Sequence, residues 1–164
     1  MFFGIALNSF VFVHTAITLV AIAAGLAMLI GMLRNQRMDM VHTVFLLFSV
    51  LTAVTGFMIQ FKPVSPAVIF GFLLSALLGL ALVARYVRHL AGAWRWIYVV
   101  TALAALYLNC FVLVVQSFLK VPALHALVPS VPPGGPLFGA VQGAVLLVFV
   151  VAGFLAVRRF HPRP

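Results

Sequence analysis

Five long stretches of this chain contain no aspartate, glutamate, lysine or arginine. They cover residues 1–33, 40–61, 63–84, 96–119 and 121–157. A helix needs about 20 consecutive apolar residues to cross about 30 Å of hydrocarbon, and each stretch is long enough. The fifth begins with a proline-rich part, from Pro122 to Pro136, which cannot lie unpaired in lipid. The remainder of that stretch is still long enough for one span.

The composition excludes a water-soluble domain. Hydrophobic residues make up 66% of the 164 positions and charged residues 7%, whereas soluble domains are about half apolar and about a quarter charged. A soluble fold of this length has too much surface for its volume to hide so much apolar area. The sequence therefore predicts an all-α, polytopic integral membrane protein with five transmembrane helices in one bundle, as a single domain over residues 1–164. We expect the helices at residues 8–33, 40–61, 66–88, 94–119 and 137–158.

The basic residues predict the orientation of the bundle. The net charge is +9, and Asp39 is the only acid. One side of the membrane would receive Arg34, Arg37, Arg85, Arg88, Arg95, Arg158, Arg159 and Arg163. The other side would receive Lys62 and Lys120. Cytoplasmic loops carry the excess of basic residues, so we expect an outside N-terminus and a cytoplasmic C-terminus. Because these charges lie at helix ends, we interpret them as contacts with the lipid bilayer, and no nucleic acid is expected as a partner.

Small residues recur four positions apart on three of the expected helices. The sets are Ala23, Ala27 and Gly31; Gly71, Ser75 and Gly79; and Gly139 with Gly143. Such ridges let membrane helices approach closely. They indicate either packing within the chain or a face for a homo-oligomer or a membrane-protein partner.

The helix expected at 94–119 carries the clearest polar face. Its members recur every three or four residues and hence share one side: Tyr98, Thr101, Ala105, Asn109, Val112 and Gln116. The helix expected at 40–61 presents a similar set: His42, Ser49, Thr52 and Gly56. Both faces should point into the bundle, where they form either interhelical hydrogen bonds or a small polar cavity for a solute, a lipid headgroup or a quinone. Tyr98, Thr101, Asn109 and Gln116 would line that cavity.

The histidines allow three interpretations, of which the first is a cofactor site. Paired imidazoles from different helices are able to ligate haem b, with His42 and His89 as an inner pair and His14 and His125 as an outer pair. The outer pair alternatively suggests a metal site, which would have few ligands because no cysteine or carboxylate lies nearby. The third interpretation is that these are ordinary interfacial histidines, with neither a cofactor nor a metal.

Catalytic motifs are missing from the sequence. Asp39 is the only carboxylate side chain, so paired-carboxylate chemistry is excluded. A phosphate-binding loop of the Walker type is absent as well. The spans hold no ionisable group that would couple transport to ions, apart from His14. We therefore assign no catalytic residues and expect a protein that is not an enzyme.

Short motifs along most of the chain, from His14 onward, are similar to those of an uncharacterised family of small bacterial inner-membrane proteins. They are Val13-His14-Thr15, Val41-His42-Thr43, Thr55-Gly56-Phe57, Ala84-Arg85-Tyr86, Gly92-Ala93-Trp94-Arg95-Trp96-Ile97-Tyr98, Tyr107-Leu108-Asn109 and Gln116-Ser117-Phe118-Leu119-Lys120-Val121-Pro122-Ala123-Leu124. Where that family has a polar, acidic stretch, this chain reads Ser130-Val131-Pro132-Pro133-Gly134-Gly135-Pro136. The resemblance implies a bacterial inner membrane and no established activity.

Three functional hypotheses follow from the sequence. The first is a non-enzymatic accessory or structural subunit that acts by association within the membrane, based on the small-residue ridges. The second is a membrane redox protein or subunit that binds haem b or quinone through the histidines and the polar face of residues 94–119. The third is a small-solute channel or transporter that uses the same polar face.

Overall fold

Seven helical segments make up the described part of the chain, residues 7–59 and 66–161 of this computed structural model. They are α1 (Leu7–Leu33), α2 (Asp39–Ile59), α3 (Pro66–Leu82), η1 (Val83–Val87), α4 (Ala93–Lys120), α5 (Pro122–Leu127) and α6 (Gly135–Arg159). Five of the helical units, α1, α2, α3 together with η1, α4 and α6, are long and apolar enough to cross a membrane. The prediction of an all-α membrane protein with five spanning helices is confirmed.

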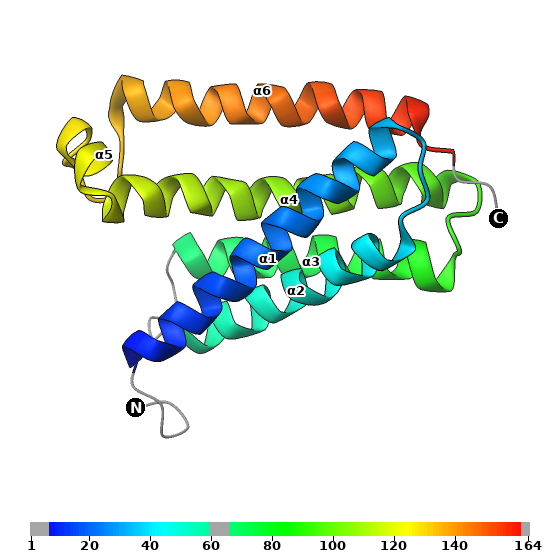
Figure 1. Cartoon of the computed structure of the whole chain (residues 1–164), viewed down its shortest axis with the longest axis horizontal. Helices are drawn as coiled ribbons and strands as arrows, with labels where there is room; N and C mark the ends of the chain where they lie inside the picture. Colours follow the sequence, from blue (N-terminus) through cyan, green and yellow to red (C-terminus); the bar gives the residue numbers. More distant parts are fainter. Residues whose placement is uncertain (1–6, 60–65, 162–164) are drawn as a thin grey trace.

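Successive spanning helices run in opposite directions along the bundle, and α4 occupies its centre (Figure 1). It packs against α3 on one side and against α6 on the other, while α1 lies across α2 and also reaches α4 (Figure 1). As a result, α4 is the most buried of the five spans and α6 is the least buried. The N-terminal and C-terminal ends of the described chain lie at opposite ends of the bundle (Figure 1).

The close crossing of α1 depends on Gly25. A Cβ atom at this position would collide with the side chain of Leu106 on α4 and would lie 2.9 Å from a ring carbon of Phe45 on α2. Glycine therefore lets α1 approach both neighbours at once, as small residues do in membrane helices. The middle of the bundle near this crossing is filled by three buried side chains, those of Phe45, Leu46 and Leu106.

Proline marks the start of three helices. Pro66 begins α3, Pro122 begins α5 and Pro136 lies in the first turn of α6. Proline suits these positions because the first N–H groups of a helix have no partner within the helix. The segment between the helices expected at 94–119 and 137–158 therefore contains the short helix α5, and α6 begins two residues earlier than expected.

The connection between η1 and α4 contains left-handed backbone. His89, Leu90 and Gly92 have φ angles of 49°, 57° and 53°, a region that glycine enters without steric cost. The chain reverses there within a few residues and starts α4 at Ala93. The π-helical turn η1 ends the third span, so the regular α-helix stops at Leu82 rather than at residue 88. The connection between the helices expected at 40–61 and 66–88 lies outside the described residues.

Candidate functional site

The polar faces of α2 and α4 meet inside the bundle. Nδ1 of His42 is 2.6 Å from the hydroxyl oxygen of Tyr98, and Nδ2 of Asn109 donates to Oγ of Ser49 at 3.4 Å. All four side chains are buried, as is Thr101. Tyr98 and Asn109 thus bond to α2, whereas Thr101 donates to the carbonyl oxygen of Ile97 in its own helix. Gln116, at the far end of the polar face, is exposed.

One cavity lies beside the end of this polar face. It has a volume of about 390 Å³ and lies between the beginning of α1, the end of α2, the beginning of α3 and the end of α4. We call it the membrane pocket. Most of its wall is apolar, and its polar lining residues are His14, Thr15, Thr18, Thr52, Asn109, Gln116, Ser117 and Lys120. Ligand sites are commonly of this kind, an apolar hollow with a few convergent polar groups.

Helix α1 places His14 in the wall of the membrane pocket. Nδ1 of His14 is 2.7 Å from Oγ1 of Thr55, and that hydroxyl is also 2.7 Å from the carbonyl oxygen of Leu51, to which it donates. A hydroxyl has one proton, so His14 donates through Nδ1 and Nε2 becomes an acceptor. Among the described residues, Nε2 has no hydrogen-bond partner.

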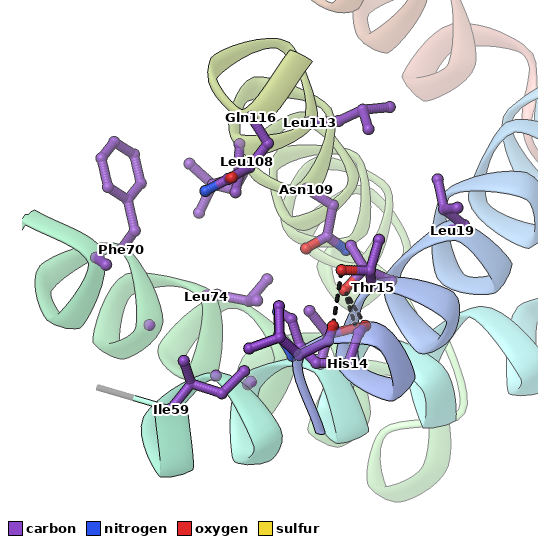
Figure 2. A pocket seen from close by; sticks show the side chains of 18 of the residues that line it. His14, Thr15, Leu19, Ile59, Phe70, Leu74, Leu108, Asn109, Leu113 and Gln116 are labelled. Carbon is purple, nitrogen blue, oxygen red and sulfur yellow. Dashed lines mark hydrogen bonds between the residues drawn. The ribbon is translucent and has the colours of Figure 1, made fainter. Parts of the chain in front are cut away.

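Helix α4 brings a second acceptor to the membrane pocket. The amide nitrogen of Asn109 is bonded to Ser49, and its Oδ1 has no partner within the described chain. Figure 2 shows Asn109 pointing from α4 toward the side of the pocket where α1 carries His14 and Thr15, with Gln116 further along α4. The pocket thus offers an imidazole and an amide oxygen, which suit a ligand that carries O–H or N–H groups.

A second hollow lies at the other end of the bundle. It has a volume of about 660 Å³ and is lined by the α1–α2 connection, the start of α2, η1, the turn before α4, the start of α4, and Phe160. We call it the basic pocket; its polar lining residues are Arg37, Asp39, His42, Thr43, Arg85, Tyr86, His89 and Arg95. Asp39 binds both Arg37, at 2.8 Å, and Arg85. Arg95 donates to the carbonyl oxygens of Val157 and Phe160 at the end of α6.

The four candidate histidines lie at three separate places. His42 and His89 both line the basic pocket. His14 lines the membrane pocket, and His125 on α5 lines neither. Within the described residues, no three histidine, cysteine or acidic side chains are grouped closely enough to hold a metal ion.

Some residues of these pockets were not singled out in the sequence. Thr18 donates to the carbonyl oxygen of His14 at 2.9 Å and accepts from Thr52 at 3.3 Å, and Asp39 joins Arg37 to Arg85. Thr18 was detectable in principle because it lies four positions after His14, on the same face of one helix. The partners of Asp39 come from different elements, and the sequence holds no signal for that pairing.

Comparisons of the chain with protein-family models, with curated proteins and with solved structures find no match.

Proposed function

We propose that this membrane protein binds a lipid-soluble molecule of the quinone class in the membrane pocket, and that the reduced, hydroxyl-bearing quinol is the preferred form. The observation that supports this is the pair of free acceptors, Nε2 of His14 and Oδ1 of Asn109, in a pocket whose other walls are apolar. A quinol matches both parts, because its ring and tail are apolar and its two hydroxyl groups donate hydrogen bonds.

The binding test uses a soluble quinone pair with the full-length protein in mild detergent. Decylubiquinol under anaerobic conditions should bind saturably and more tightly than decylubiquinone, while decylbenzene, which has no oxygen, should not bind. Asn109→Leu should weaken quinol binding about tenfold, the effect of losing a hydrogen bond worth about 1.4 kcal/mol. Cys110→Ala is the matched control, since Cys110 is the next residue on α4 and does not line the pocket.

Two results would count against quinol binding. One is equal affinity for decylubiquinol and decylbenzene, which would mean that only the apolar wall is recognised. The other is quinol affinity unchanged in both Asn109→Leu and His14→Phe. These results leave the membrane character of the chain untouched, because that rests on its five apolar helices.

A second proposal is that the protein is an accessory or structural subunit that associates within the membrane. It is favoured by small residues that face outward: Cβ atoms built at Gly79 on α3 and at Gly143 on α6 would meet nothing within 4 Å. Gly143→Leu should therefore fit the single chain and yet reduce self-association or co-purification of a partner. Val148→Leu, at an exposed position on another side of α6, is the control. Equal association of both variants and the original chain would contradict the proposal.

We further propose that the membrane is the bacterial inner membrane, with the N-terminus outside and the C-terminus in the cytoplasm. The resemblance to bacterial inner-membrane proteins supports the compartment. The charge distribution supports the orientation, because the ends of α1, η1 and α6 and the start of α4 bring their arginines to one end of the bundle. The positive-inside rule assigns that end to the cytoplasm.

A further inference from the structure

The basic pocket plays no part in the proposed binding of quinol and carries a charge of its own. Three arginines line it, Arg37, Arg85 and Arg95, against the single carboxylate of Asp39. The pocket therefore has a net positive charge whether its histidines are charged or neutral. It also lies at the end of the bundle where α1, η1 and α6 end, which is the level of the lipid headgroups if these helices span the bilayer.

Arg85 is held firmly at the inner wall of this pocket. Its side chain is only 9% exposed and bonds to Asp39 through Nη2. The guanidinium carbon also lies 5.5 Å from the centre of the Tyr98 ring, within the range of a cation–π contact. A guanidinium carries several N–H donors in one plane, and the bond to Asp39 uses only one nitrogen. The arrangement fixes the plane in advance, so little side-chain entropy is lost when an anion binds.

His42 adds a buried polar atom without a partner. The residue is 1% exposed, and its ring is stacked between Tyr98 and Phe160 at centroid distances of 5.6 and 5.7 Å. Nδ1 meets the Tyr98 hydroxyl, but Nε2 has no hydrogen-bond partner in the described chain. The Tyr98 hydroxyl is also 3.7 Å from the sulfur of Met28, but a thioether is a weak acceptor. Tyr98 therefore donates to Nδ1 of His42, the imidazole proton lies on Nε2, and a donor is left on the lining of the basic pocket. A buried donor without a partner is costly, which indicates an acceptor from outside the chain.

We propose that the basic pocket binds a phosphate group, presented either by the headgroup of an anionic phospholipid or by a soluble phosphate ester. The acceptor oxygens of a phosphate match the planar guanidinium donors of Arg85, and charge-assisted bonds of this type are strong. Basic pockets between membrane helices on the cytoplasmic side are recognised sites for anionic headgroups. The proposal requires only the net positive pocket, Arg85 and the free Nε2 of His42.

The test measures thermal stability of the full-length protein in mild detergent at constant ionic strength. It is titrated separately with phosphatidylglycerol, with phosphatidylcholine and with glycerol 3-phosphate, and native mass spectrometry counts the bound molecules. We expect phosphatidylglycerol to raise the denaturation midpoint saturably, with one molecule bound, and phosphatidylcholine to have little effect. Arg85→Gln should weaken this binding by about tenfold or more. Arg159→Gln is the matched control, because Arg159 is an exposed arginine near the same end of the bundle and does not line the pocket.

The outcomes separate the sources of phosphate and the alternatives. A shift with phosphatidylglycerol alone assigns the site to lipid, and an equal shift with glycerol 3-phosphate assigns it to a soluble ester; both support the proposal. Equal effects of phosphatidylglycerol and phosphatidylcholine, or equal losses in Arg85→Gln and Arg159→Gln, overturn it. If Arg85→Gln does not fold, His42→Phe keeps the ring stack and removes the donor, and unchanged binding in that variant overturns the proposal. A haem absorption band that is lost in His42→Phe would also overturn it.

Discussion

The two histidines that the sequence shows in similar settings make similar contacts in space, although Nε2 is an acceptor in His14 and a donor in His42. His14 and His42 each lie near the start of a helix and are each followed by threonine. Each uses Nδ1 for a hydroxyl on another helix, Thr55 or Tyr98, and leaves Nε2 without a partner in the described chain. Because α1 and α2 are antiparallel, the two imidazoles face pockets at opposite ends of the bundle.

The hydroxyl of Tyr98 is expected to stabilise the fold through His42. Tyr98→Phe removes the partner of Nδ1 in a site that is fully buried, so the free energy of unfolding should fall by about 1 kcal/mol. The measurement is the thermal denaturation midpoint in detergent. Tyr107→Phe is the control on the same helix, because the Tyr107 hydroxyl makes no hydrogen bond within the described residues. Equal midpoints for the two variants would show that the bond between Tyr98 and His42 contributes nothing.

The elements themselves were largely predictable, since charge-free stretches of sufficient length have few alternatives to membrane helices. The outcome differed where local chemistry was misread. No helix was expected in the proline-rich part after Lys120, yet Pro122 at the first position of a helix starts α5. The π-helical turn η1 shifts the backbone hydrogen bonds by one residue. No residue type in the sequence predicts such a shift.

The crossing of α1 with α2 and α4 gives a prediction for Gly25. Alanine is the better helix former by about 1 kcal/mol, but its Cβ would collide with Leu106 and press on Phe45. Overpacking of this type costs about 1–3 kcal/mol, so Gly25→Ala should lower the denaturation midpoint. Gly79→Ala should raise the midpoint or leave it unchanged, because the space around Gly79 is open. If Gly25→Ala is as stable as Gly79→Ala, then α1 does not pack as closely as the structure describes.

At the scale of the whole molecule, the sequence predicted which faces turn inward but not which side chains meet. The periodicity of Tyr98, Thr101 and Asn109 assigns them to one side of α4, and all three are buried. The pairing of Ser49 with Asn109 depends on the rotation and height of α2 relative to α4, which a single sequence does not encode in any local pattern. For the same reason, the sequence predicted a polar cavity only as one of two alternatives, the other being hydrogen bonds between helices.

The orientation of the bundle is testable without any ligand. Green fluorescent protein fused to the C-terminus should be fluorescent, because it folds in the cytoplasm. Alkaline phosphatase fused at the same place should be inactive, because its disulfides form only outside the inner membrane. Replacing Arg34, Arg37 and Arg88 by glutamine should weaken the charge bias and yield a mixed population. An active phosphatase fusion on the original chain would reverse the proposed orientation.

The position of α6 after every residue of the membrane pocket has a consequence for how the protein is made. Every residue that lines the membrane pocket precedes α5, whereas the basic pocket uses Phe160, and Arg95 holds the last carbonyls of α6. During synthesis, the first pocket can therefore assemble while α6 is still on the ribosome. The second can close only after α6 has left the ribosome and entered the membrane, so an occupied basic pocket would mark a chain in which α6 is already inserted.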